Sequence, residues 1–150
     1  MSVSKALQRL LRIRELEEEQ HRVSLESALG ELHTLERARE AAHESERQGR
    51  AWVGASLESG EIADRQAGLF EAEAARKRAR VLRPRIAKSE MEAARRRAEF
   101  LDKRLERRQA ATLIEATEAR DKIESGRRGQ RDIDDWFGAR RHRASEAENL

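Results

Sequence analysis

The chain has 150 residues, of which 41% are charged and only 3% are aromatic, with a formal net charge of +3. It contains three Phe, two Trp and no Tyr, too few bulky side chains for a compact core, and the absence of Cys excludes disulfides, Cys-based zinc sites and thiol nucleophiles. No run approaches the roughly 20 apolar residues of a membrane span. The first residues also lack a signal peptide, so we expect a cytoplasmic protein.

Ala, Leu, Glu and Arg dominate the sequence, and regularly spaced apolar residues favour long helices over a disordered chain. The first predicted helix covers residues 3–47. Its apolar stripe consists of Leu7, Leu10 and Ile13, and then of Leu25, Ala28, Leu32 and Leu35. Residues 17–22 interrupt this stripe with an entirely polar run.

A break is predicted at residues 48–60, because Gly and Ser there disfavour a helix and permit a turn. If the chain reverses its direction near residue 54, residue i lies opposite residue 108 − i. The fold class predicted from this arrangement is all-α, with two long helices forming an antiparallel coiled-coil hairpin over residues 1–125. Such a hairpin is a rod with little room for a shielded active site.

The second predicted helix covers residues 61–124. One expected pairing seam consists of Ala75, Ala79, Leu82 and Ile86, and a second consists of Met91, Ala94, Ala98, Leu101 and Leu105, at the spacing of 3.5 residues that is typical of coiled coils. Pro84 lies beside the jump between these seams and predicts a bend or local unwinding of the helix, unless the supercoil absorbs a mild stutter.

The end of the second helix is predicted to overhang its partner. With residue i opposite residue 108 − i, the start of the first helix lies opposite residue 105. Residues 106–124 would therefore extend beyond the first helix by roughly 28 Å. Leu113, Ile114 and Ile123 form an apolar stripe there, which indicates an external partner, with a frayed or folded-back end as the alternative. A tail follows at residues 126–150, in which a short helix could present further apolar side chains, Ile133, Trp136 and Phe137.

The sequence offers no recognisable catalytic, cofactor-binding or metal-binding residues, so we expect a non-enzymatic protein without cofactors. Its four His have no metal-ligand neighbours at helical spacing, and its carboxylates lack a pocket that would shift their pKa values. Residues 76–108 carry 14 basic and 5 acidic groups. This excess could meet an acidic protein, an anionic lipid surface or nucleic acid. Specific nucleic-acid binding is disfavoured, because neither stacking aromatics nor a reading-helix motif accompanies the arginines.

The sequence Asp132-Ile-Asp-Asp-Trp-Phe-Gly-Ala-Arg-Arg141, together with the length and the Ala/Glu/Arg-rich hairpin, resembles the FliJ family, the coiled-coil component of the flagellar protein-export apparatus. That family tends to end with a hydrophobic residue, Asp-Glu and a short Arg-containing stretch. Here Ile133, Asp134 and Asp135 take this place, and Asp135 departs from the usual Glu. The YscO family of non-flagellar type III secretion has the same size and shape, so both resemblances stay open.

The resemblance implies a stalk that inserts into a hexameric export ATPase and couples it to the membrane protein of the export gate and to export chaperones. It implies a cytoplasmic location at the inner face of the cell membrane, reached through partners. The expected ATPase-side contacts are Leu7, Leu10, Leu11, Leu113, Ile114, Ile123, Ile133, Trp136 and Phe137. The expected gate-side contacts are Trp52, Leu69 and Phe70. The alternatives are a self-associating structural coiled coil and a nucleic-acid-binding rod.

Overall fold

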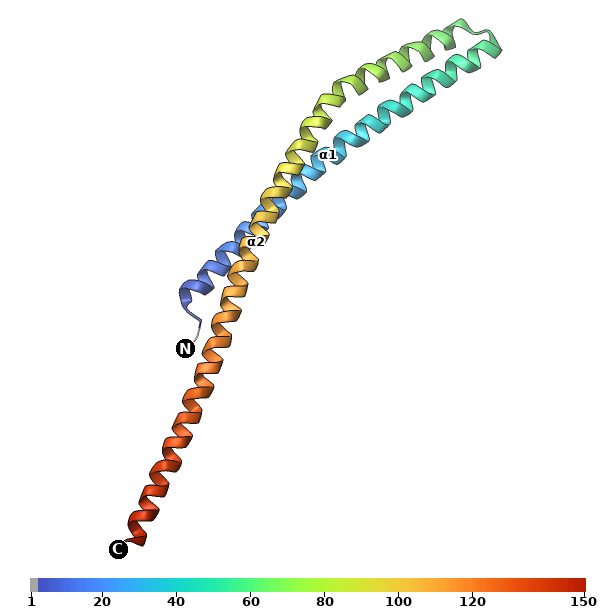
Figure 1. The fold of residues 1–150 in the computed structure, drawn as a ribbon. Coiled ribbons are helices and arrows are strands. Elements are labelled where there is room, and N and C mark those ends of the chain that lie inside the picture. The colour runs from blue at the N-terminus through green and yellow to red at the C-terminus, as the bar shows by residue number, and fades with distance from the viewer. Residues whose placement is uncertain (1–2) are drawn as a thin grey trace. The chain divides into compact units, whose positions relative to one another are not determined.

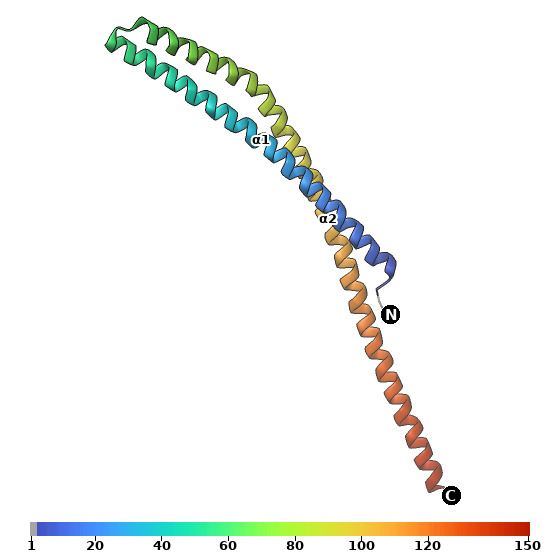
Figure 2. The same cartoon turned by 180° about the vertical axis from the view of Figure 1, so that it is seen from behind.

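The computed structural model describes residues 3–150, which form two α-helices that pack against each other (Figures 1 and 2). Helix α1 spans Lys5–Ser59 and helix α2 spans Ile62–Glu148. The Ser4 hydroxyl caps the start of α1 by accepting a hydrogen bond from the Leu7 amide at 3.2 Å. The predicted all-α class and the pairing of two long helices are confirmed.

The turn between the helices is much shorter than predicted. It consists of Gly60 and Glu61, and Gly60 adopts a φ of +75°, which glycine tolerates best. The Gly60 amide donates to the Ser56 carbonyl at 2.8 Å and so satisfies one of the last carbonyls of α1. The prediction of a break over residues 48–60 is therefore wrong, because α1 continues to Ser59.

Gly49 lies inside α1 because it permits a close approach of the two helices. A Cβ atom on Gly49 would lie 2.6 Å from the Gly68 carbonyl oxygen and 2.8 Å from the Ala72 amide nitrogen of α2. The relation is reciprocal, because a Cβ atom on Gly68 would lie 2.6 Å from the Gly49 carbonyl oxygen. The glycine that suggested a turn in the sequence is thus a packing residue, whose helix-propensity cost is offset by the contact it allows.

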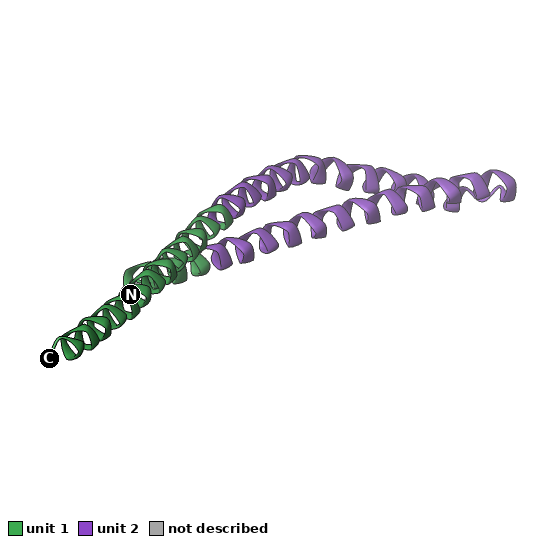
Figure 3. Cartoon of the chain, turned by 60° about the horizontal axis from the view of Figure 1, so that its bottom comes forward, with its two compact units in different colours: residues 1–17, 104–150 green, residues 18–103 purple. Residues whose placement is uncertain are grey.

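The chain divides into two compact units, one formed by residues 18–103 and the other by residues 1–17 and 104–150 (Figure 3). In residues 18–103, the ring nitrogen Nδ1 of His21 lies 3.7 Å from a carboxylate oxygen of Glu99. In the other unit, an Arg14 guanidinium nitrogen lies 2.9 Å from a Glu106 carboxylate oxygen. The two residue numbers in each pair add to 120, so residue i faces residue 120 − i. The predicted value of 108 is wrong because the turn lies at Gly60 instead of residue 54.

The pairing faces repeat every seven residues, as in a heptad coiled coil. In α1 the buried or half-buried positions of one repeat are Leu7, Arg14, His21, Ala28, Leu35, Ala42, Gly49 and Ser56. In α2 they are Gly68, Ala75, Leu82, Ser89, Arg96, Lys103, Ala110 and Thr117. Small and polar side chains thus dominate the seam, which explains how a chain with few large apolar residues forms a long hairpin.

The predicted seams of α2 have different outcomes. The seam containing Ala75 and Ile86 is confirmed, because both residues are buried. The seam from Met91 to Leu105 is wrong: Met91 is 75% exposed, and Leu101 and Leu105 are also exposed. The buried residue at this level is Ala93. The larger apolar side chains suggested the wrong face, since the half-buried positions of the heptad repeat here are Arg96 and Lys103.

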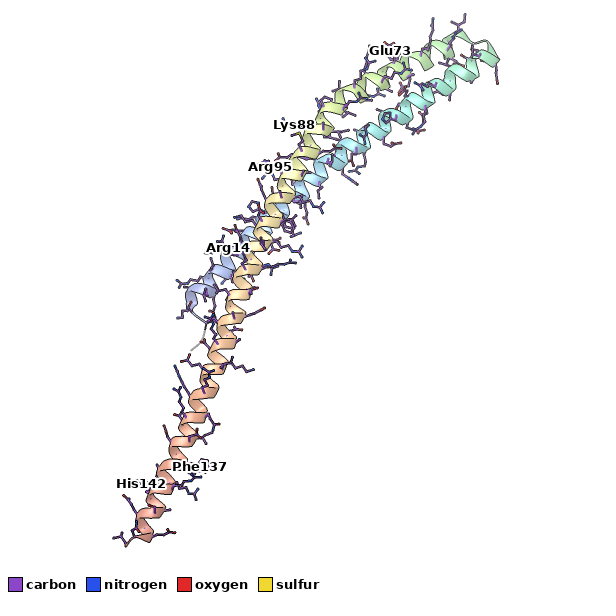
Figure 4. All side chains as sticks on the ribbon, in the orientation of Figure 1. Arg14, Glu73, Lys88, Arg95, Phe137 and His142 are labelled. Atoms are coloured by element: carbon purple, nitrogen blue, oxygen red, sulfur yellow. The ribbon has the colours of Figure 1, made fainter. Side chains whose placement is uncertain are left out.

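Helix α2 bends close to its only proline. Figure 4 shows a change of direction between the labelled residues Glu73 and Lys88, and Pro84 lies in this interval. The backbone is helical on both sides, so the predicted bend is present and the alternative of local unwinding is not. Proline removes one helical hydrogen bond and its ring presses on the preceding turn, which accounts for a bend without a break.

The predicted helix end at residue 124 and the separate tail at residues 126–150 are also wrong, because α2 continues to Glu148. Two interactions between residues four apart support this stretch: Arg128 pairs with Glu124 at 2.7 Å, and Gln130 donates to Asp134 at 3.0 Å. Gly126 and Gly129 each cost about 1 kcal/mol relative to alanine in a helix, which does not suffice to end it. Every residue from 122 to 150 is exposed.

Candidate partner-binding surfaces

The first candidate surface lies on the α2 segment of the unit formed by residues 1–17 and 104–150. We call it the C-terminal stripe, and it consists of Leu113, Ile123, Ile133, Trp136 and Phe137. Each of these side chains is between 49% and 59% exposed, so each has apolar area available for a partner. Upstream, a shallow groove of about 460 Å³ is lined by Leu105, Thr112, Leu113 and Ala116, among others.

The aromatic end of the C-terminal stripe is ordered by local contacts. The rings of Trp136 and Phe137 meet edge to face with their centroids 5.0 Å apart, and the guanidinium carbon of Arg140 lies 5.3 Å from the Trp136 ring centroid. Figure 4 shows Phe137 and His142 on this last part of α2. A preformed aromatic pair with a neighbouring cation is a suitable anchor, because less side-chain freedom is lost on binding.

Four of the predicted ATPase-side residues lie on the pairing faces of the hairpin and not on the C-terminal stripe. Leu7, Leu10, Leu11 and Ile114 are half-buried, and Leu7 lies seven residues before Arg14, which contacts Glu106 of α2. Their first role is therefore to hold the two helices together. The sequence could not separate Ile114 from its neighbour Leu113, because this distinction depends on the register of the hairpin.

The second candidate surface lies next to the turn, in the unit of residues 18–103. The predicted gate-side residues Trp52, Leu69 and Phe70 are all exposed there. Further exposed apolar side chains on the same part of the hairpin are Leu57 and Ile62, which the sequence analysis did not assign to a site. The long break predicted at residues 48–60 hid the position of Leu57, because it left this residue in an unstructured loop.

Basic side chains from both helices gather near this second surface. Two neighbouring hollows of about 470 and 420 Å³ share Arg76 and Arg80, and the α1 residues Arg50 and Arg39 line one hollow each. The sequence revealed the arginines of α2 but not those of α1, because the predicted register placed other residues opposite. Further along α2, the three arginines at residues 95–97 are partly neutralised, because Arg95 and Arg96 both pair with Glu92, at 2.6 and 2.9 Å.

Glu46 joins the two helices near these hollows. Its carboxylate accepts hydrogen bonds from Arg76 of α2 at 2.9 Å and from Arg50 of its own helix at 2.6 Å. The hydrogen bond from Arg76 and the charges of Arg50 and Arg76 lower the pKa of Glu46 below its usual value of 4.5. A carboxyl group whose pKa is lowered by folding stabilises the folded state above its unfolded pKa, and this stabilisation is lost as the pH falls through the folded pKa.

We therefore expect the hairpin to lose stability as the pH falls below 4.5, and Glu46→Gln to lose less, since the variant cannot be protonated there. Thermal unfolding at neutral and acidic pH, followed by circular dichroism, measures this difference. Glu31→Gln serves as a control, because no ion pair of Glu31 occurs within residues 3–150. An equal acid-induced decrease in Tm for Glu46→Gln and the unaltered chain would contradict the role of this ion pair.

No cluster of three or more His, Asp or Glu side chains within residues 3–150 could hold a metal ion. Neither of the described helices contains an apolar stretch that could cross a bilayer. Comparison with known proteins gives no match among protein-family models, curated proteins or solved structures.

Proposed function

We propose that this chain is a non-enzymatic stalk of a bacterial protein-export ATPase, of the flagellar type or of the related type III secretion system. The observation that carries the proposal is the C-terminal stripe: Leu113, Ile123, Ile133, Trp136 and Phe137 are exposed on one long helix. Apolar and aromatic side chains exposed in such number indicate a binding surface. The similarity of residues 132–141 to the FliJ family suggests which partner that surface meets.

In this proposal, the last part of α2 overhangs the hairpin and enters the central pore of the hexameric ATPase. Residues 122–148 continue the helix as exposed turns, and they have a length of roughly 40 Å at 1.5 Å per residue. A single helix about 10 Å wide suits a narrow pore. Co-elution of the purified chain with the cognate ATPase in size-exclusion chromatography tests the contact, and separate elution at micromolar concentrations would count against it.

The turn end of the hairpin would then contact the membrane protein of the export gate and the export chaperones, at the inner face of the cell membrane. Trp52 and Phe70 are the aromatic side chains exposed there, and aromatic residues are the commonest energetic anchors of protein interfaces.

Replacing Trp52 and Phe70 with alanine should weaken binding of the gate's cytoplasmic domain by about 700-fold, since each of the two aromatic anchors contributes about 2 kcal/mol. Binding to the ATPase should be unchanged. Titrations with each partner, followed by calorimetry, measure both effects. The reverse pattern, with ATPase binding lost and gate binding kept, would show that the two ends of the hairpin have the opposite assignment.

A second candidate function is a structural protein that self-associates through the same C-terminal stripe. The observation that favours it is that two members of the stripe, Ile123 and Phe137, lie fourteen residues apart, which is two heptads of a coiled coil. Sedimentation equilibrium decides between the two functions, because a self-associating chain increases in mass with concentration and the proposed stalk remains monomeric.

A further inference from the structure

One side of the hairpin, within residues 18–103, carries a basic face that continues into apolar residues at the turn. We define it by the basic residues Arg39, Arg50, Arg76, Lys77, Arg80 and Arg83 and the apolar residues Leu57, Ile62 and Leu69. The two hollows described above share Arg76 and Arg80, so their basic side chains lie on one side of the two helices. Leu69 lines the first hollow together with Arg50 and Arg76, which joins the apolar part to the basic part.

The helical spacing places the remaining apolar residues on the same face. In α2, Ile62, Leu69, Arg76 and Arg83 follow each other at intervals of seven residues. In α1, Leu57 lies seven residues after Arg50. Leu57 and Ile62 are 67% and 72% exposed, respectively, and they flank the turn at Gly60. The basic face therefore ends, at the turn, in aliphatic side chains that protrude into solvent.

The positive charge of this face is only partly neutralised. Glu46 pairs with both Arg50 and Arg76, and Lys77 lies 3.7 Å from Glu73. Among residues 3–150, however, no carboxylate pairs with Arg39, Arg80 or Arg83. Six basic side chains thus share the face with two carboxylates, and three guanidinium groups remain available to bind anions.

We propose that this face docks directly on an anionic lipid bilayer, independently of any protein partner at the membrane. Arginine binds phosphate oxygens through two parallel hydrogen bonds, so Arg39, Arg80 and Arg83 suit phospholipid headgroups. Leu57 and Ile62 would enter the boundary between headgroups and acyl chains, as the apolar residues of peripheral proteins do. Cations and protruding aliphatic side chains on one face match a bilayer surface, whereas a nucleic acid offers no apolar layer for Leu57 and Ile62.

Co-flotation of the full-length chain with lipid vesicles tests the proposal without any export component, so its outcome is separate from that of the ATPase experiments. One set of vesicles contains phosphatidylcholine alone, and the other contains about a third phosphatidylglycerol, which gives the surface a negative potential. The chain should float only with the anionic vesicles, and high salt should release it. Equal flotation with both sets, or none with either, would overturn the proposal.

Variants of the basic face make the test specific. Each arginine near an anionic surface contributes about a fivefold gain in binding, so Arg80→Glu with Arg83→Glu should weaken binding at least about 25-fold. Arg127→Glu with Arg128→Glu changes the net charge equally on exposed residues outside the face and should leave binding nearly unchanged. If both double variants lost vesicle binding equally, the loss would reflect the net charge of the chain alone, and the assignment of binding to this face would be overturned.

The apolar part of the face has its own control. Leu57→Asp with Ile62→Asp should weaken binding several-fold, because the new carboxylates are repelled by the lipid phosphates and cannot enter the apolar layer. Val23→Asp with Leu29→Asp adds the same charge at exposed apolar positions on α1 and should have a smaller effect. If instead duplex DNA competes fully with the vesicles, while the Leu57 and Ile62 substitutions have no effect, the face binds nucleic acid and the proposal fails.

Discussion

Replacing Leu113 and Ile123 with aspartate is expected to remove the stimulation that we propose this chain exerts on the export ATPase. Leu113 and Ile123 are exposed apolar members of the C-terminal stripe, and a buried anchor of a protein interface contributes about 2 kcal/mol or more. Losing two such anchors should weaken binding to the ATPase by about 700-fold or more. Steady-state ATP hydrolysis, measured with the purified chain and its cognate ATPase, should then equal that of the ATPase alone.

A matched variant separates this effect from a general effect of added charge. Val23 and Leu29 are 52% and 47% exposed, close to the 59% of Ile123 and the 49% of Leu113, and they lie outside the C-terminal stripe. Val23→Asp with Leu29→Asp should therefore stimulate the ATPase normally. Both double variants should remain helical by circular dichroism, since all four residues are exposed. Full stimulation by the variant with Asp at 113 and 123 would show that the C-terminal stripe does not contact the ATPase.

Replacing Gly49 with alanine is expected to destabilise the hairpin by about 1–3 kcal/mol, the usual cost of overpacking a tight contact. The new methyl group would lie 2.6 Å from the Gly68 carbonyl oxygen and 2.8 Å from the Ala72 amide nitrogen. Both are backbone atoms, so the helices themselves must move apart. Urea unfolding followed by circular dichroism measures the change in the free energy of unfolding.

The same substitution five residues further on provides the control. No atom lies within 4 Å of the position that a Cβ would take on Gly54, which is exposed in the same helix. Gly54→Ala should therefore stabilise the hairpin by up to about 1 kcal/mol through its higher helix propensity. Stabilisation by both substitutions would show that the helices do not approach closely at Gly49.

The sequence predicted the class of the fold correctly because composition and spacing are properties of each helix alone. The length of α1 was wrong, since a glycine that enables packing and a glycine that forms a turn look the same in a sequence. Gly49 is buried against α2, whereas Gly60 has the positive φ that ends α1. The seam of α2 was wrong for a separate reason, because the larger apolar side chains placed Met91 in it and left Ala93 out.

The exposed surfaces, like the fold, could be predicted only in part from the sequence. Leu113 and Phe137 are exposed, as a surface for a partner requires, although Leu113 lies opposite Leu7 of α1 in the observed register and not beyond the first helix. Ile114 was not distinguished from them, since its burial depends on which residues α1 places opposite. The basic face was missed for the same reason, because Arg39 and Arg50 join the arginines of α2 only in the observed register.

The hydrolysis rate of the cognate export ATPase, measured with increasing amounts of the purified chain, tests most directly whether this chain acts on that ATPase. We expect the rate to rise and to saturate near one chain per ATPase hexamer. An unchanged rate at every ratio, without co-elution of the two proteins, would contradict this expectation.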